Sequence, residues 1–203
     1  MAKGIVRKIT MQEVKETLGK LSLTNQYQVH FSTLSKTISD YLKRSRGIID
    51  VDNFLSRNVG ILCSDASLPA SAFATGEVKD NFMGIPQEFA HTRLYTDIDF
   101  TFYVDEDYTS LSIFEGWMDF ISSGVSTNLN DKGFFRRFRY PDDYKVNTMT
   151  ITKFEKNIQR TLSYSFKNAF PKTITSLPVT YGSADLLKVT VNFNYDRYVV
   201  NRS

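Results

Sequence analysis

The chain has 203 residues and a net charge of +3, with 41% hydrophobic and 23% charged residues, as in an ordinary globular protein with one well-filled core. No apolar run approaches the ~20 residues that cross a bilayer, and no apolar segment follows the basic start, so we expect neither a membrane anchor nor a secretory signal. The single cysteine, Cys63, excludes an intrachain disulfide, and with only two histidines it does not suffice for a zinc site.

Residue patterns predict the elements of the first third in chain order. Thr10 and Glu13 form a capping box at the start of a helix over 10–21. Alternation then predicts a strand over 26–32. The elements expected next are short helices over 35–47 and 50–58 and a strand over 59–66, which ends at a Ser-Leu-Pro turn.

The remaining chain predicts more strands than helices. Alternation favours a strand over 94–104, and helical spacing favours a helix over 108–121 with Leu111, Phe114, Met118 and Ile121 on its buried stripe. The segment 125–143 is typical of a loop. Three further strands are expected over 146–154, 160–170 and 187–198.

The order of elements predicts the fold class. The 16 Phe and 11 Tyr favour strands, and strand and helix do not alternate as they do in parallel α/β folds. We therefore expect a mainly β fold, an antiparallel sandwich or barrel-like domain with one central packed helix. The expected unit is a single domain over 1–203 with a short helical extension over about 1–24.

The sequence lacks the patterns of the common catalytic sites. No Gly-x-Ser-x-Gly and no Gly-x-Gly occurs, so neither a nucleophile elbow nor a phosphate cradle is indicated. His30 and His91 have no activated serine near them, and Cys63 lies among apolar residues, typical of a buried thiol. We expect no enzyme activity, no cofactor and no metal site.

Charge is segregated along the chain. Seven acidic residues and no Lys or Arg occur over 94–130, while arginines and aromatics are dense over 134–140. The acidic triplet at 105–107 favours a helix N-terminus over a metal site, and the basic cluster favours a protein interface over nucleic acid. We expect contacts between subunits from two sets of residues: Arg136, Arg137 and Arg139, and Asp105, Glu106 and Asp107.

Taken together, the ordered segments resemble the tail tube protein of contractile-tail bacteriophages, over about 25–198. The resemblance rests on the order of these segments rather than on one motif. They are the strand over 25–31, the strand and Leu-Pro turn over 63–69, Asn81-Phe82-Met83-Gly84, the acidic strand end over 97–107, the helix with Phe114, Trp117 and Ile121, Phe170-Pro171, and the strand over 188–198.

The resemblance implies a structural virion protein. Six copies would form a ring whose inner sheets join into one β-barrel, and rings would stack into a hollow tube inside a contractile sheath. The implied partners are the sheath, baseplate and tape-measure proteins, with DNA passing through the lumen. Such a protein would assemble in the host cytoplasm and end in the phage tail.

Three alternatives remain open. A tube-fold baseplate initiator or tube terminator would share the fold. A β-barrel that binds single-stranded nucleic acid would use the basic and aromatic cluster, with a steep dependence on salt. A carboxylate-based hydrolase would need paired acids in a cleft.

The strand over 146–154 has a face suited to a wet channel. Met149 and Ile151 can face the core, while Thr148, Thr150 and Thr152 present neutral hydroxyls on the other face. We expect these threonines to face the lumen, where a wall without cations lets DNA slide. The alternative is that they are ordinary β-branched residues of an outer sheet.

Overall fold

The computed structural model describes residues 10–19, 21–79, 84–122, 137–155, 161–175, 177–179, 181–182 and 184–202. The helical elements are short apart from two of eleven and thirteen residues, α2 and α5. In chain order they are α1 (Met11–Leu18), α2 (Lys36–Arg46), α3 (Val51–Asn53), η1 (Phe54–Asn58), α4 (Val59–Leu62), α5 (Thr109–Ile121) and α6 (Pro141–Tyr144).

The strands pair antiparallel throughout the described residues. They are β1 (Tyr27–Phe31), β2 (Cys63–Ala66), β3 (Ser71–Val78), β4 (Gln87–Tyr95), β5 (Ile98–Tyr103), β6 (Val146–Phe154), β7 (Thr161–Ile174), β8 (Lys188–Asn194) and β9 (Arg197–Arg202).

The long strand β7 belongs to two sheets. Its first part pairs with β6 and β9 to give the order β1-β6-β7-β9, which we call sheet A. Its end pairs with β8 to give the order β7-β8-β5-β2, which we call sheet B. Asn168 has a φ of +58° between the two parts, and a register shift follows Pro171. Such irregularities bend a strand, so β7 can turn a corner from one sheet to the other.

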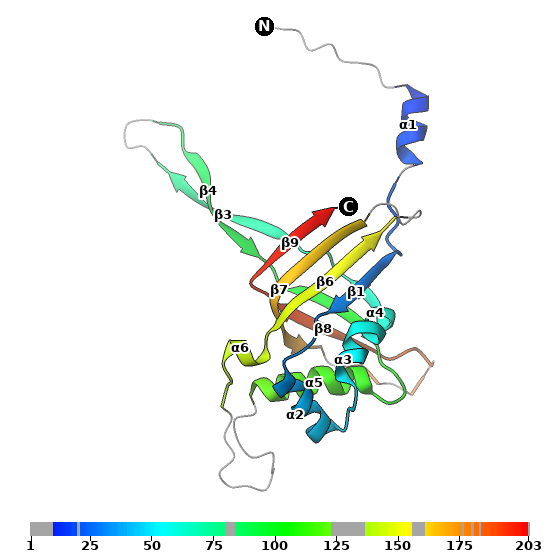
Figure 1. Ribbon diagram of the computed structural model, residues 1–203. Coiled ribbons are helices and arrows are strands. Elements are labelled where there is room, and N and C mark those ends of the chain that lie inside the picture. Colours follow the sequence, from blue (N-terminus) through cyan, green and yellow to red (C-terminus); the bar gives the residue numbers. More distant parts are fainter. Residues whose placement is uncertain are drawn as a thin grey trace.

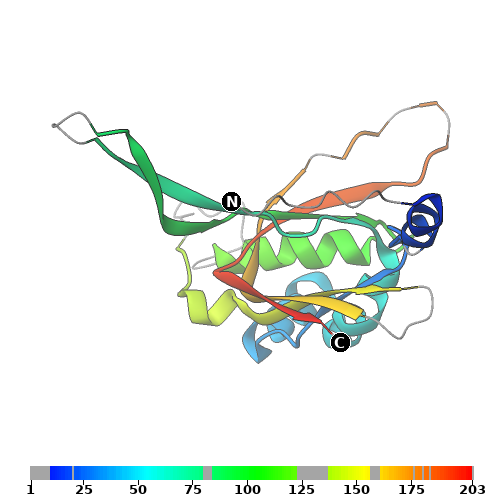
Figure 2. The same cartoon turned by 90° about the horizontal axis from the view of Figure 1, so that it is seen from above.

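Helix α5 lies in the middle of the molecule, between the layers of strands (Figure 2). Phe114 is fully buried and contacts Phe31 of sheet A and both Phe102 and Phe193 of sheet B, with ring centroids 5.0–6.5 Å apart. On the side of α2, a Cβ on Gly116 would collide with the side chain of Leu42, so any larger residue at 116 would require Leu42 to move. The mainly β antiparallel fold with one central packed helix is therefore as predicted.

The predicted stripe of α5 was only partly right. Phe114 is buried, but the other large apolar residues that the helix buries are Ile113, Trp117 and Phe120, while Leu111, Met118 and Ile121 are half-buried. A helix covered on more than one side buries residues all round, so a single apolar stripe does not identify its core face.

The segment 59–66 was predicted as one strand, but its first half is helix α4. A short apolar run such as Val-Gly-Ile-Leu does not distinguish helix from strand. Here it continues the helical stretch of α3 and η1, and Ile61 is 80% exposed. The strand β2 begins only at Cys63.

Two other strand predictions needed correction. The strand expected over 187–198 ends at Asn194, and the chain turns at Tyr195–Asp196 into β9, so the two halves join different sheets. The strand expected over 94–104 is also two strands, because residues up to Tyr95 belong to β4. Strand β4 pairs with β3 in a hairpin that the sequence pattern did not predict.

Candidate assembly surfaces

Sheet A has one face in the core and one face open. Met149, Ile151 and Phe166 are buried at 1% exposure or less. The open face carries three cross-strand rows of mostly polar side chains, none of them acidic: Gln28, Thr152, Ser163 and Asn201; His30, Thr150, Ser165 and Val199; Ser32, Thr148, Lys167 and Arg197. The three threonines expected on one face thus share it, half-buried and opposite the core residues.

The open face is not uniformly neutral. Lys167 and Arg197 lie in the row of Thr148, and Lys167 Nζ donates a hydrogen bond to Thr148 Oγ1 at 2.9 Å. The other two rows carry hydroxyls and amides, with His30 as their only ionisable residue. Positive charge is therefore concentrated at one end of the face, which the pattern of β6 alone did not reveal.

The two edges of sheet A differ. Along β1, helix α4 approaches so closely that a Cβ on Gly60 would lie 2.7 Å from the backbone oxygen of Val29, and glycine alone fits there. Strand β9 pairs with β7, and no other described strand pairs with it. Proteins commonly cover one sheet edge with a helix, whereas an open edge presents unpaired backbone groups to another chain. The edge of β9 is thus available for pairing.

The hairpin β3–β4 extends away from the rest of the molecule (Figure 1). One of its faces carries Ala72, Ala74, Gly76 and Val78 of β3, opposite Leu94, Thr92, Phe89 and Gln87 of β4. Val78, Phe89 and Leu94 are 47–56% exposed. An isolated two-stranded hairpin is at best marginally stable in water, so a largely apolar face of this length indicates a surface that a partner covers.

An aromatic cluster fixes the base of the hairpin to sheet A. The guanidinium of Arg93 lies 5.3 Å from the ring centre of Tyr95 and 5.4 Å from that of Tyr198, and its Nη2 donates to Tyr198 Oη at 3.1 Å. Hydrogen bonding with Ser71, then with Arg93, lowers the pKa of Tyr198. Because Tyr198 belongs to β9, the direction of the hairpin is tied to the open edge of sheet A.

The two charged clusters lie at opposite ends of α5. Asp105 Oδ1 accepts a hydrogen bond from Ser110 N at 3.1 Å, close to the start of the helix. Burial opposes the charge of Asp105, but hydrogen bonds from Thr109 and Ser110 outweigh it and lower the pKa. Glu106 and Asp107 are exposed beside it. The preference for a helix N-terminus over a metal site fits this position.

Among the basic residues that the structure describes, Arg139 lies at the C-terminal end of α5. Arg139 Nε donates to Phe120 O at 3.1 Å, Arg139 N donates to Ile121 O at 2.9 Å, and the guanidinium covers the ring of Phe120 at 4.2 Å. Arg139 thus caps the C-terminal end of α5 by donating to its last carbonyl groups. Arg137 is exposed, and Arg136 lies outside the described residues. Sequence reasoning recognised the charges but not that α5 separates them by about 20 Å, at 1.5 Å per residue.

No group of metal-ligating side chains occurs among the described residues. Burial raises the pKa of Cys63 to about 12, so its thiol stays protonated and unreactive. His30 is exposed on sheet A, and His91 is exposed in the hairpin, where its Nδ1 lies 2.8 Å from Thr92 Oγ1. Within the described residues, no helix has the length and apolar character that crossing a membrane requires.

The surfaces described above, which are the open face of sheet A, the edge of β9 and the hairpin β3–β4, are of the kind that assembly through strands uses. The model of the phage tail tube protein family matches residues 22–201. The chain belongs to the phage tail tube protein family. Among curated protein sequences, none matches this tail tube protein.

Solved structures similar to this tail tube protein include chains of a contractile injection system and of the anti-feeding prophage. A chain of an extracellular contractile injection system, the PVC sheath-tube complex in its extended state, is 14% identical, with a TM-score of 0.57 over 97% of this chain and 100% of that one. A chain of the anti-feeding prophage tube terminating cap is 14% identical, with a TM-score of 0.58 over 90% and 92%. A chain of the anti-feeding prophage baseplate is 9% identical, with a TM-score of 0.57 over 90% and 96%. At these identities the similarity establishes the fold.

Family membership makes the chain a structural tube-type protein of a phage tail and not an enzyme. The resemblance inferred from the ordered segments is thereby confirmed. The match covers the described elements from β1 to β9, apart from the last residue of β9, and includes both sheets and the hairpin.

Proposed function

We propose that this tail tube protein forms six-membered rings that stack into a hollow conduit for DNA, surrounded by a contractile sheath. The observation that carries the proposal is sheet A, whose one face is core and whose other face is an uncovered polar array. Barrel strands alternate between interior and exterior, and a water-filled interior requires polar side chains. The open face of sheet A, with Thr148, Thr150 and Thr152, faces the lumen.

Ring closure follows from the strand edges. The open edge of β9 meets the β1 side of the next copy, so each subunit supplies four strands to a common wall. Helix α4 covers the backbone at Val29, so the new ladder does not run along the whole of β1. Closing the barrel satisfies backbone groups that the isolated subunit leaves exposed.

The hairpin and the charged ends of α5 join neighbouring subunits. The hairpin lays its apolar face, with Ala74 and Phe89, on an adjacent copy. The acidic end of α5, at Glu106 and Asp107, meets the basic end at Arg137 of another copy in a head-to-tail contact. Head-to-tail contacts repeat without limit, as the growth of a tube requires.

The lumen wall suits a polyanion that must slide. Hydroxyls and amides in two of the three rows offer no fixed cation to bind phosphate tightly. In a ring, Lys167 and Arg197 give a single basic level. Phosphate contacts limited to one level are screened by salt and do not hold the duplex along the whole tube.

The partners follow from this architecture. The outer surface of the tube contacts the sheath, one tube end joins the baseplate, and a tape-measure protein sets the length. The fold is shared with a terminating cap and a baseplate chain, so a terminator or initiator is the second candidate. A terminator or an initiator would form one ring layer rather than a growing stack.

Sedimentation velocity and negative-stain microscopy of the concentrated protein test the proposal. We expect rings about as thick as one subunit, and stacks of them at higher concentration. Single rings that never stack would favour the terminator or initiator. A monomer at every concentration, even with sheath and baseplate proteins added, would refute assembly by this chain.

A further inference from the structure

Helix α1 is formed but has no partner within the described structure. Both hydrogen bonds of its capping box are present: Glu13 N donates to Thr10 Oγ1 at 3.4 Å, and Thr10 N donates to Glu13 Oε2 at 3.0 Å. Yet Met11 is 72% exposed, Val14 38% and Leu18 59%, and α1 buries no residue. Figure 1 shows α1 standing clear of the sheets. An eight-residue helix is marginal in water on its own, so its apolar stripe indicates a docking face.

The charges of α1 are arranged around this stripe. At about 100° per residue, Met11, Val14 and Leu18 fall on one side of the helix, and Lys15 borders them. Glu13 and Glu16 fall on the opposite side. The docking face of α1 is therefore apolar with a basic border.

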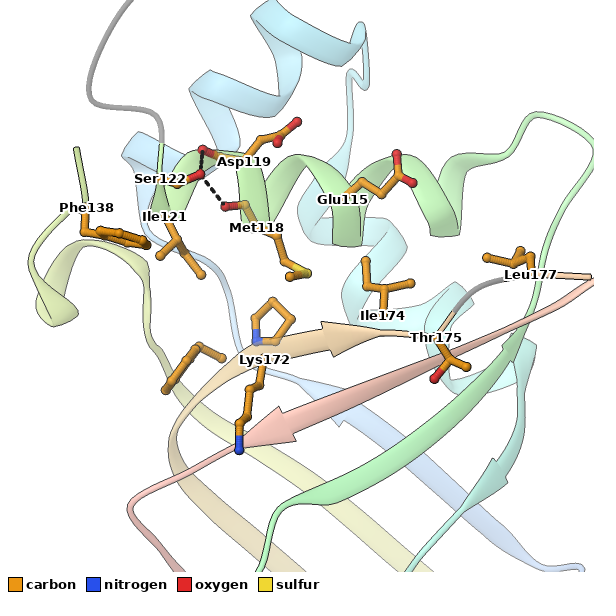
Figure 3. A pocket seen from close by; sticks show the side chains of 12 residues that line it. Glu115, Met118, Asp119, Ile121, Ser122, Phe138, Lys172, Ile174, Thr175 and Leu177 are labelled. Atoms are coloured by element: carbon orange, nitrogen blue, oxygen red, sulfur yellow. Dashed lines mark hydrogen bonds between the residues drawn. The ribbon is translucent and has the colours of Figure 1, made fainter. Parts of the chain in front are cut away.

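An apolar groove of about 630 Å³ lies between α5 and the end of β7. Figure 3 shows Met118 of α5 and Ile174 of β7 on opposing walls, with Phe138 towards one end and Leu177 towards the other. A groove of this size receives one apolar face of a short helix.

Of the charged side chains that line the groove, Glu115 is the one without an ion pair to another described residue. Asp119 is paired with Arg46 and Lys172 with Asp97, each at 2.6 Å. Glu115, on the rim from α5, is exposed, and no described residue bonds to it. Lys15 on the border of the α1 stripe has the complementary charge and likewise has no described partner.

We propose that α1 of one copy docks in the groove between α5 and β7 of a second copy, with its apolar stripe on Met118 and Ile174 and Lys15 beside Glu115. This contact deepens the proposed function, since it rests on assembly of the chain with itself. The docked helix would be a third contact between copies, beside the edge of β9 and the hairpin β3–β4.

A charge exchange tests the contact in the full-length protein. Lys15→Glu places like charges together and should weaken self-association about five-fold or more, and Glu115→Lys in the same chain should restore it. Val14→Asp should weaken association at least ten-fold, because a carboxylate would enter an apolar groove. The matched control is Glu16→Lys, which reverses a charge on the far side of α1 and should leave association unchanged. Sedimentation velocity gives the association constants, and circular dichroism checks folding.

A crosslink identifies the copy that receives the helix. In a Cys63→Ala background, Val14→Cys and Ile174→Cys are made in separate chains and mixed with a short bismaleimide. A crosslinked dimer in the mixture alone supports docking between copies. A third variant carries both Val14→Cys and Ile174→Cys in one chain. If this double variant crosslinks only within itself, or if Val14→Asp assembles like the parent, the inference is wrong while the proposed tube function stands. If the parent protein shows no self-association at all, the proposed function itself fails.

Discussion

Among single residues, Phe114 is one that contacts both sheets in the core. Its ring is fully buried and stacks on Phe102 at 5.0 Å, with Phe31 and Phe193 on other sides. We expect Phe114→Ala to lower the free energy of unfolding by about 3–5 kcal/mol through lost transfer energy and the cavity left behind. Urea denaturation of the unassembled subunit measures this. Tyr140→Ala, at a site 78% exposed, is the control and should change it by less than about 0.5 kcal/mol. Equal midpoints for the two variants would mean that α5 is not the centre of the core.

Carboxylates held by hydrogen bonds make stability depend on acid pH. Burial opposes the charge of Asp97, but hydrogen bonds from Lys172 and Asn194 outweigh it and lower the pKa below its ordinary value. Hydrogen bonds from Asn168 and Lys145 lower the pKa of Asp196. A lowered folded pKa gives stability that is complete well above pH 4 and lost as the pH falls through the folded value.

We therefore expect the free energy of unfolding to be flat between about pH 5 and 7 and to decline below pH 4. The double variant Asp97→Asn with Asp196→Asn should decline less over the same range. Asp40→Asn, at an exposed site on α2, should follow the parent. Denaturant unfolding at each pH gives the curves, and a steeper decline in the double variant would contradict the assignment.

Residue-level prediction from sequence succeeded where one side of an element meets the core. In β8 the apolar residues that alternate with polar ones, Val189, Val191 and Phe193, are all buried, because the sheet has one covered face. The predicted core residues of α5 were incomplete. The helix is covered on several sides, so its buried residues do not form one apolar stripe opposite a polar surface. The role of Arg139 could not be predicted, because the bonds to Phe120 and Ile121 depend on how the chain returns to the helix end.

Among the elements, the hairpin β3–β4 is the one that the sequence pattern did not predict. Its first strand contains Ala72, Ala74 and Gly76, which have low strand propensity, so no alternation of large apolar residues marks it. Its small residues make sense for a flat face that another chain covers. Helix α4 was missed for a related reason, since its apolar run fits either element.

Ala74 provides a test of the hairpin as an assembly arm. We expect Ala74→Glu to abolish ring or tube formation, because the face shared by Ala74 and Phe89 would bury a carboxylate in the contact. The subunit should stay folded, because the hairpin lies outside the core cluster. Thr75→Glu, on the other face of the same strand, is the matched control and should assemble. Gel filtration and microscopy compare the two, and assembly of Ala74→Glu at the parent concentration would exclude this face as the contact.

At the scale of the whole molecule, charges of opposite sign lie at the two ends of α5, with Glu106 and Asp107 near its start and Arg139 at its C-terminal end. We expect Arg136→Glu with Arg137→Glu to prevent stacking at normal salt, because like charges would then face each other between copies. Adding Glu106→Lys and Asp107→Lys should restore stacking. Arg139 is left unchanged because it caps the C-terminal end of α5. Light scattering against salt concentration follows the assembly, and tubes formed equally well by the arginine variant would show that these ends do not meet.

The central claim is that the open face of sheet A lines the lumen of a closed ring. Cryo-electron microscopy of the assembled protein, at a resolution that separates side chains, tests it most directly. We expect sixfold rings in which Thr148, Thr150 and Thr152 face the channel, Lys167 and Arg197 form one basic level, and β9 lies against the β1 side of the next subunit. Rings with these threonines on the outer surface, or with sheet B lining the channel, would contradict it.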